Sequence, residues 1–500
     1  MKARPRALFR CDASPAIGAG HVTRCLALAE ALAETGWCAE FSVARGTISM
    51  VPALAVGDFA VHELSSDKDE PAALRDYCPD GVDLFVVDHY QRDIQFEEAC
   101  RGWAHQILVM DDATGRRHDC DILVDAAVSD RSAYEGGVPA QARLLLGPAY
   151  ALVRRSFIEH RPRTLARRDG RAVNNILVSF GATDPSNVTS IALDALAGFA
   201  EHQSITIALS SRAPHLEGIR GKLCGRMRLV LDADMAALMT EADIGIGAAG
   251  ASAFERAVLG LPSIIVTLSD NQRGIATMLT EAGAAIDAGR INKTLASRLG
   301  QITRTLIGDS GARVRMTEAA TALVDGRGAQ RLLIEIAGDA RARDGANVRL
   351  SLAEKGDEDW LLQLQRAPQT RRYAKNPAVP TADEHAGWMA RMLANPEVYL
   401  LIIEVDGEDT GCIRLDRVKN GLANAVFEIS IAVCPNVHGR GIGSVALSLA
   451  RRLQQNAVFE AEILPGNIAS QRLFAAAGFR QVDATRYRQQ SAQRQVLARW

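Results

Sequence analysis

The first thirty-odd residues show two different patterns of hydrophobic residues. A short apolar run that begins near Leu8 ends in a loop rich in serine, proline and glycine. Beyond this loop, Val22, Leu26, Ala29 and Ala33 recur at the spacing of one face of a helix. The pattern predicts a strand, a loop and a helix in that order, with the helix beginning close to residue 21.

Continuous apolar runs of strand length extend this alternation through residue 155. Residues 84–90 and 107–112 are two such runs, and each ends in polar residues. Runs of this kind are typical of buried parallel strands whose carboxyl ends face a crevice. Residues 1–155 are therefore predicted to form a doubly wound α/β lobe.

A second α/β lobe is predicted for residues 156–338. After a polar, arginine-rich connection at residues 160–174, residues 175–187 show a strand, a glycine-containing loop and a helix. Residues 242–268 then show a strand, a loop of small residues, a helix that begins near Ser252 and another strand.

The pattern changes after residue 338. Residues 339–346 are small and polar without periodicity, which predicts a linker. Residues 399–405 and 411–415 then flank an acidic turn at residues 406–409, which indicates an antiparallel hairpin. Residues 347–500 are predicted to form a separate α+β domain.

Composition narrows the class of protein. The 500 residues, 48% of them hydrophobic, are too many for one core, and the net charge of −2 provides no overall basic surface for nucleic acid. The nine cysteines contain no Cys-x-x-Cys pair, and no run approaches the roughly 20 apolar residues of a membrane span. We expect a cytoplasmic protein that binds neither nucleic acid nor membrane.

The predicted start of the first helix places a histidine where it can act as a base. Unpaired N–H groups and the helix dipole favour the neutral imidazole of His21, and the charge of Arg24 acts in the same direction. Gly18 and Gly20 let the backbone approach a ligand closely, and Asp12 is placed to orient the ring. The alternative is that His21 only starts a helix and that the glycines only make a turn.

Two loops of the second lobe have the composition of anion sites. The loop at Gly181 is expected to aim helix N–H groups at an anion. Small residues around Gly247 and Gly250 are expected to let a diphosphate lie on the helix that begins near Ser252, with Glu255 placed for ribose hydroxyls. Ser252 and Glu255 also match a capping box, so the alternative is that Glu255 only closes its own helix.

The third domain carries a glycine-rich stretch after a predicted strand at residues 427–433. Glycines at positions 439, 441 and 443 free successive N–H groups to wrap a pyrophosphate at the start of a helix. Glu428, on the strand before them, is the candidate base for an incoming amine. A carboxylate that merely faces solvent is the alternative.

The opening segment resembles the UDP-sugar hydrolases of pseudaminic acid biosynthesis, in which a strand runs into Asp-x-Ser-x-x-Ile-Gly-x-Gly-His and a helix. Segments similar to those of the family recur in the same order at residues 87–90, 111–121 and 146–154. The resemblance implies two Rossmann-like, GT-B-like lobes with the active site in the cleft between them, and His21 as the base that activates water.

The same resemblance implies a uridine site in the second lobe and further substrate-binding residues, namely Tyr90, Arg154, Asn271 and Gln272. Asp232 and Asp234 match the Asp-x-Asp metal motif of other glycosyltransferases. GT-B proteins do not rely on that motif, and the second aspartate is placed to cap a helix near Met235. We predict no metal.

Residues 438–444 and 464–479 resemble the acetyl-CoA loop and the Asn-x-x-Ser segment of GNAT acetyltransferases. The resemblance implies acetyl-CoA as acetyl donor, bound by Val433, Arg440, Gly441, Gly443, Ser444 and Asn467. His438 stands where the family usually has Gln or Arg, and Phe474 stands where it often has a tyrosine general acid. His385 and Trp388 resemble the substrate side of acetyltransferases that act on 4-amino UDP-sugars; the alternative is an amphipathic helix.

The sequence thus predicts a bifunctional enzyme of pseudaminic acid biosynthesis or a close nonulosonic acid route. From the two resemblances we expect the GNAT domain to acetylate a UDP-4-amino sugar and the GT-B-like part to hydrolyse the product to free sugar and UDP without a metal. One rival is a glycosyltransferase that uses a UDP-amino sugar. Another is a UDP-sugar-binding scaffold fused to a protein acetyltransferase.

Overall fold

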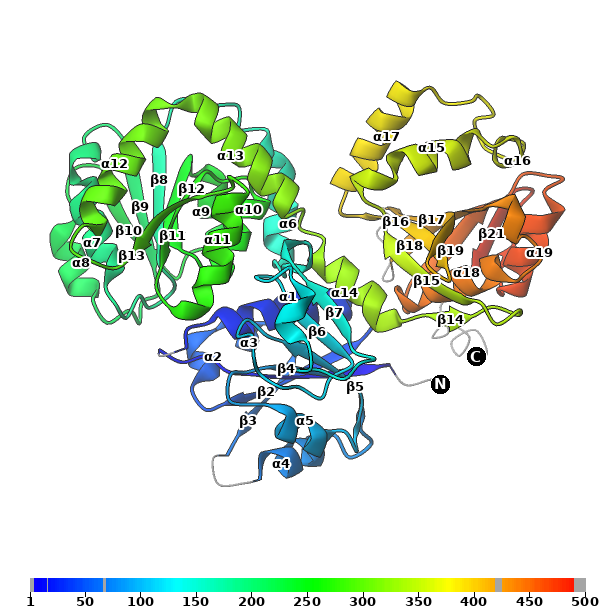
Figure 1. Cartoon of the computed structure of the whole chain (residues 1–500), viewed down its shortest axis with the longest axis horizontal. Helices are drawn as coiled ribbons and strands as arrows, with labels where there is room; N and C mark the ends of the chain where they lie inside the picture. The colour runs from blue at the N-terminus through cyan, green and yellow to red at the C-terminus, as the bar shows by residue number, and fades with distance from the viewer. Residues whose placement is uncertain (1–3, 16, 66–68, 419–424, 490–500) are drawn as a thin grey trace. The chain divides into compact units, whose positions relative to one another are not determined.

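The structure, a computed structural model, describes residues 4–15, 17–65, 69–418 and 425–489. The chain forms two compact units, one made of residues 5–31 and 38–329 and the other made mainly of the residues from 330 onward. The first unit contains two parallel sheets, and the second contains one mostly antiparallel sheet (Figure 1).

The first lobe is built on a seven-stranded parallel sheet in the order β3-β2-β1-β4-β5-β6-β7. Its strands are β1 (Arg6–Cys11), β2 (Cys38–Ala44), β3 (Ala60–Leu64), β4 (Val82–Asp88), β5 (Ala104–Met110), β6 (Ile122–Asp125) and β7 (Arg143–Leu146). Its helices are α1 (Gly20–Glu34), α2 (Thr47–Met50), α3 (Ala53–Val56), α4 (Glu70–Tyr77) and α5 (Ile94–Cys100). The apolar runs predicted as strands are β4 and β5. Because the strand order reverses between β1 and β4, their carboxyl ends border the crevice in which doubly wound sheets bind ligands.

The second lobe has a six-stranded parallel sheet in the order β10-β9-β8-β11-β12-β13, which reverses between β8 and β11. Its strands are β8 (Asn175–Ser179), β9 (Ser204–Leu209), β10 (Met227–Leu231), β11 (Ile244–Ala248), β12 (Ser263–Thr267) and β13 (Ile286–Arg290). Its helices are α6 (Arg155–Leu165), α7 (Val188–Leu196), α8 (Leu216–Lys222), α9 (Met235–Glu241), α10 (Ala251–Val258), α11 (Arg273–Glu281), α12 (Leu295–Gly308) and α13 (Ser310–Leu323). The next helix, α14 (Gly328–Ala337), belongs from Gln330 onward to the other compact unit.

Apolar side chains cover both faces of this second sheet, as a buried parallel sheet requires. Figure 1 shows α7, α8 and α12 on one face and α10, α11 and α13 on the other, and each face has its own buried core. The connection predicted at residues 160–174 begins instead as part of helix α6. This helix is ordered by packing, because Thr164 donates to Thr240 of α9 at 3.1 Å and Phe157 is buried.

The third domain has an eight-stranded sheet in the order β14-β15-β16-β17-β18-β19-β21-β20. Its strands are β14 (Ala340–Arg341), β15 (Asn347–Leu352), β16 (Val398–Val405), β17 (Glu408–Val418), β18 (Val426–Val433), β19 (Val458–Glu462), β20 (Arg480–Gln481) and β21 (Arg486–Gln489). Its helices are α15 (Glu358–Arg366), α16 (Pro368–Arg371), α17 (Ala382–Ala394), α18 (Ile442–Arg452) and α19 (Ile468–Ala476).

Two features of the third sheet bear on function. The predicted hairpin is β16 and β17, and its turn is only Asp406 and Gly407, both at positive φ, as a two-residue turn requires. The parallel strands β18 and β19 pair only from Val426 to Glu428 on β18. Among the described residues, positions 429–433 have no partner on β19, so the two strands separate toward the glycine-rich stretch.

The segment predicted as a linker enters the third sheet. Within residues 339–346, Arg341 of β14 pairs opposite Asn347 of β15. The preceding helix α14 also bonds to this domain, since Gln330 Nε2 donates to the carbonyl of Pro396 at 2.9 Å. The limits at residues 338 and 347 stay a prediction.

Candidate active site

His21 lies in the first turn of α1, where the hydrophobic pattern predicts it. Its Nδ1 is hydrogen-bonded to Oδ1 of Asp88, at the end of β4, and both side chains are buried. Because an ionised carboxylate only accepts hydrogen bonds, Nδ1 carries the proton and Nε2 is left as an acceptor. Tyr90 packs edge-on against the imidazole, with ring centroids 4.6 Å apart.

Arg24 controls the charge of Asp88. Its Nε and Nη2 donate to the two carboxylate oxygens at 2.6 Å each, and its Nη1 donates to Asp112 at 3.1 Å. Burial alone would raise the pKa of Asp88, but the Arg24 charge and the bond to His21 outweigh it and hold this pKa well below its usual range. Asp88 is therefore ionised and can stabilise an imidazolium at His21.

The structure corrects the prediction that Asp12 orients the imidazole. Asp12 accepts two bonds from the buried Arg10, at 2.6 and 3.0 Å, and it pairs with Nε2 of His89 at 2.9 Å. Asp12 follows β1 and Asp88 ends β4, so both carboxylates stand at the same edge of neighbouring strands. Through His89, Asp12 instead holds the loop that carries Tyr90.

Sequence reasoning missed Asp88 as the partner of the histidine. The signal was present, because Asp88 is the polar end of the apolar run at residues 84–88 and therefore stands at the carboxyl edge of a buried strand. The sequence offered no comparable signal for Arg24 as the residue that keeps Asp88 ionised.

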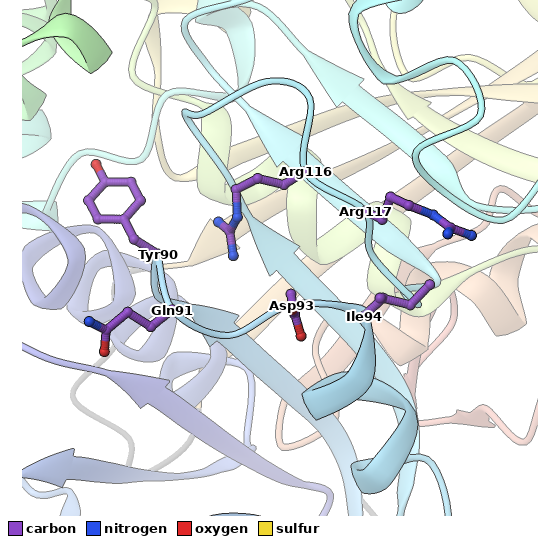
Figure 2. A pocket seen from close by; sticks show the side chains of 6 residues that line it. All are labelled: Tyr90, Gln91, Asp93, Ile94, Arg116 and Arg117. Atoms are coloured by element: carbon purple, nitrogen blue, oxygen red, sulfur yellow. The ribbon is translucent and has the colours of Figure 1, made fainter.

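A cavity of about 380 Å³ lies beside the Tyr90 loop (Figure 2). It is lined by Tyr90, Gln91, Asp93, Ile94, Arg116 and Arg117. Arg116 donates to Asp111 at 3.0 Å and to the carbonyl of His89 at 3.1 Å, so it ties the Tyr90 loop to the segment after β5. In Figure 2 the ring of Tyr90 and the guanidinium of Arg117 extend in opposite directions.

Asn271 and Gln272, in the short turn after β12, connect the second lobe to this site. Asn271 Nδ2 donates to the hydroxyl of Tyr90 at 2.7 Å, which joins residues of both lobes. Gln272 Oε1 accepts from the backbone of Leu268 at 3.0 Å, and its amide lies 3.4 Å from the place of a Cβ at Gly250. Burial raises the pKa of Tyr90, with Asp112 adding to the effect, so this hydroxyl stays protonated.

The loop predicted to hold a diphosphate joins β11 to α10. Helix α10 begins at Ala251 with Gly250 as its N-cap and has no side-chain cap. The capping box considered for Ser252 and Glu255 is therefore not formed, and the carboxylate of Glu255 makes no hydrogen bond with any residue that the structure describes. Burial raises the pKa of Glu255 to about 7, although Arg256 and Arg154 act in the opposite direction.

The loop at Gly181 differs from the prediction. Asp184 accepts from the backbone N–H groups of Val188 and Thr189 at 3.0 and 2.7 Å, so the first turn of α7 is satisfied by the protein itself. This corrects the expectation that these N–H groups are aimed at an anion. Gly181 has a φ of 100°, and a Cβ there would meet nothing within 4 Å.

The other predicted residues of the first unit are placed as follows. Gly18 has a φ of 76°, and Cβ atoms at Gly18 and Gly20 would meet nothing within 4 Å. Arg154 pairs with Glu30 at 2.7 Å. Asp234 caps α9, as its spacing predicts. No group of three potential metal ligands occurs in the described part of the chain, and metal independence stays a prediction.

In the third domain, the predicted acetyl-CoA loop lies at the start of α18, beyond the point where β18 and β19 separate. Val433 ends β18, and its carbonyl is bonded to Nε2 of His438 at 2.9 Å. Gly441 is the N-cap of α18 with a φ of 88°, and Gly443 and Ser444 occupy its first turn. Arg440 pairs with Asp344, and Asn467 caps α19 by accepting from Ser470 at 3.2 Å.

The substrate-side residues of this domain divide into two groups. Glu428 accepts from Lys375 at 2.6 Å, and Lys375 also pairs with Glu462 at 2.7 Å. His385 is buried against Trp388, with ring centroids 5.3 Å apart, and its Nε2 has no hydrogen-bond partner among the described residues. Phe474 is a core residue that packs edge-on against Phe479.

Comparison with known proteins defines the class. Residues 219–330 match the glycosyltransferase family 28 C-terminal domain, and residues 347–480 match the acetyltransferase (GNAT) domain. The two parallel sheets form two Rossmann-like lobes, the second of which matches a glycosyltransferase C-terminal domain, and a GNAT domain follows them. The chain is therefore an enzyme. The GNAT domain implies acetyl-CoA as a substrate.

The N-terminal part is a homologue of a particular hydrolase. The UDP-2,4-diacetamido-2,4,6-trideoxy-beta-L-altropyranose hydrolase of Campylobacter jejuni is 28% identical over 287 residues, which cover 56% of this chain and 98% of the hydrolase. The structure of Acinetobacter baumannii MurG has a TM-score of 0.48 at 15% identity and covers 66% of this chain and 98% of its own. The GNAT domain of S. lividans PAT has a TM-score of 0.25 at 25% identity, with coverage of 30% and 93%. None of the described helices is long and apolar enough to cross a membrane.

Proposed function

We propose that the chain acetylates the 4-amino group of a UDP-4-amino-4,6-dideoxy-N-acetyl-altrosamine, or of a close nonulosonic acid precursor. It then hydrolyses the product to UDP and the free 2,4-diacetamido sugar. The observation that carries this proposal is the site of His21, Asp88 and Tyr90, bonded to Asn271, on a chain that also has an acetyltransferase domain. The 28% sequence identity to the hydrolase of Campylobacter jejuni supports the same substrate.

His21 is the base of the hydrolytic step. Its Nε2 takes a proton from water as the water oxygen attacks the anomeric carbon with inversion, and the carbon–oxygen bond to the diphosphate breaks. Asp88 stabilises the imidazolium that forms. UDP is a good leaving group, and N–H groups at the Gly250 turn take up the charge of the diphosphate, while Glu255 accepts from the ribose hydroxyls.

Acetyl transfer uses the separated strands of the third domain. The sugar amine loses a proton to Glu428 and attacks the acetyl carbon of acetyl-CoA, whose pyrophosphate lies on the loop before α18. Phe474 has no proton to give, so the leaving thiolate takes its proton from water or from a group not identified, and the nitrogen of the new amide releases its extra proton to solvent. A 4-amino UDP-sugar is the acceptor whose acetylated product the hydrolase part of the same chain would then consume.

The order of the two steps follows from the charge of the substrate. At neutral pH the unacetylated sugar carries an ammonium group, and desolvating this charge without a carboxylate partner is costly. We therefore expect the hydrolase to act on the acetylated UDP-sugar with at least about tenfold higher kcat/KM than on its 4-amino precursor. UDP release from both substrates without acetyl-CoA measures this ratio, and equal values would contradict the order.

A product assay tests the whole proposal. The full chain is incubated with the 4-amino UDP-sugar and acetyl-CoA, and the products are identified by NMR. Free diacetamido sugar formed without any acceptor supports hydrolysis. Release of UDP only when an acceptor is added would support a glycosyltransferase instead, a candidate that the match of residues 219–330 favours. UDP binding without turnover would support a scaffold fused to a protein acetyltransferase.

A further inference from the structure

A buried arginine stands directly behind the turn between β11 and α10. The side chain of Arg256 runs back along α10, where Nη2 donates to the carbonyl of Ala248 at 2.7 Å and Nη1 donates to Oγ of Ser252 at 3.2 Å. Arg256 is only 2% exposed, and its Nε has no hydrogen-bond partner among the described residues. The guanidinium is therefore buried at this turn, and its Nε–H donor has no acceptor among the described residues.

The two glycines of β11, Gly245 and Gly247, leave room for the side chain of Arg256. A Cβ at Gly247 would lie 2.3 Å from the carbonyl oxygen of Ser179 and 2.8 Å from Nη1 of Arg256, and a Cβ at Gly245 would lie 2.9 Å from the Arg256 Cδ. This corrects the expectation that the small residue at 247 makes room for a ligand. At Gly250, in contrast, the nearest atom to a Cβ is 3.4 Å away.

Other arginines of the second lobe show why the place of Arg256 is unusual. Arg161 donates to the carbonyl of Val258, at the C-terminus of α10, and Arg313 donates to that of Ile307, near the end of α12, at 3.0 Å. Arg168 donates to Met239 in α9 at 3.0 Å. These cations lie at the negative ends of helices, where the dipole stabilises them. Arg256 itself belongs to the last turn of α10, but its guanidinium reaches back to Ser252 and Ala248 at the N-terminus of the helix, the positive end.

The positive charge of Arg256 has no bonded counter-ion among the described residues. Glu255 is its neighbour in sequence, but its carboxylate makes no hydrogen bond with a described residue. Burial lowers the pKa of Arg256 to about 10, against the opposing effect of Glu255, so the guanidinium is still charged at neutral pH. A desolvated cation beside the positive end of a helix is stabilised when an anion binds at that turn.

We propose that Arg256 is a positioning residue that keeps a fixed positive charge behind the Gly250 turn, and that this charge makes the turn select a nucleoside diphosphate over an uncharged nucleoside. The proposal rests on the function above, in which this turn takes UDP. Arg256 acts on the ligand through its field and through the backbone and hydroxyl that it holds, without touching the ligand.

The test compares the affinities of the full chain for UDP and for uridine, measured by titration calorimetry. Arg256→Gln keeps a donor but removes the charge, whereas Arg256→Lys keeps the charge. We expect Arg256→Gln to weaken UDP binding at least tenfold while changing uridine binding less than threefold, and Arg256→Lys to retain most of the preference for UDP. Arg161→Gln is the matched control, because it removes the arginine of α6 that donates to the carbonyl of Val258 at the C-terminus of α10, and it should leave the ratio of the two affinities unchanged.

Each outcome decides the proposal. If Arg256→Gln weakens UDP and uridine equally, or weakens neither, Arg256 is only a structural residue. If Arg256→Gln does not fold, the comparison of Arg256→Lys with wild type decides: a lost preference for UDP despite the retained charge would overturn the proposal. If the wild-type chain binds neither ligand, the proposed function fails by itself, which distinguishes that failure from an error about Arg256.

Discussion

The two parallel lobes differ sharply at the same topological position. At the switch point of the first lobe, between β1 and β4, the residues are charged and bonded to one another, as in the set of His21, Asp88, Arg24 and Asp112. At the switch point of the second lobe, between β8 and β11, the turn consists of small residues and backbone, with Arg256 buried behind it.

This difference teaches which lobe can perform which task. A proton-transfer step needs a titratable group in a defined protonation state, and the switch point of the first lobe supplies His21, whose tautomer is fixed within a network of charges. Binding of a diphosphate needs convergent N–H donors and a positive field, which a helix N-terminus with no side-chain cap provides. We therefore propose that the first lobe performs the chemistry and that the second lobe binds the nucleotide.

The largest effect is expected when the base, His21, is removed. His21→Ala should reduce UDP release by about 10²-fold or more while acetyl transfer is unchanged, because the acetyltransferase residues lie in another domain. Both rates are measured on the full chain, by UDP release and by free thiol release. His62→Gln, in β3, is the control and should be close to wild type. Near-normal hydrolysis by His21→Ala would remove the proposed mechanism.

The second prediction distinguishes the roles of Asp88 and Asp12 in hydrolysis. Asp88→Asn should lower kcat of hydrolysis about 10- to 100-fold, because it removes both the partner that fixes the His21 tautomer and the charge that stabilises the imidazolium. Asp12→Asn should lower it less, by about tenfold or under, since Asp12 acts only through His89 and the Tyr90 loop. A larger loss with Asp12→Asn than with Asp88→Asn would reverse our assignment of the orienting residue.

A third prediction uses the raised pKa of Glu255 in the second lobe. With a pKa of about 7 in the folded state against an ordinary value of 4.5, Glu255 keeps a proton on folding that the unfolded chain releases, so stability falls as pH rises from about 4.5 to 7. Glu255→Gln should abolish this loss and raise the melting temperature of the first unit by about 5 °C at pH 8, with little effect at pH 4.5.

The same substitution should weaken UDP binding about tenfold if Glu255 accepts from the ribose hydroxyls. Calorimetric melting and UDP titration of the same preparation test both effects. A more stable variant with unchanged UDP affinity would exclude Glu255 from the nucleotide site.

The smallest effect concerns the boundary before the third domain. A fragment of residues 330–500 should melt about 5 °C higher than one of residues 347–500, because the longer fragment retains β14 and the bonds of α14, including Gln330 to Pro396 and Arg331 to Glu354. Both fragments are compared by circular dichroism. Equal melting temperatures would show that residues 330–346 act only as a linker.

Much of the fold could be predicted from the sequence because hydrophobic period and turn chemistry are local. The strands β4 and β5, helix α1 with His21 in its first turn, and the hairpin of β16 and β17 follow from runs of a few residues each. The two parallel sheets confirm both predicted Rossmann-like lobes, and the family match at residues 347–480 confirms the GNAT domain. The strand within residues 339–346 could not be predicted, because a two-residue edge strand such as β14 has no hydrophobic pattern of its own.

The sequence by itself determined which residue types stand at the carboxyl ends of the buried strands and at the starts of the helices that follow them, because these places depend on local pattern. Only the tertiary structure decided which of these residues meet. Asp88 lies 67 positions from His21 yet bonds to it, whereas the much closer Asp12 bonds to His89. The order of parallel strands makes distant residues neighbours, and no local pattern encodes that order. For the same reason only the fold shows that Gly245 and Gly247 make room for Arg256.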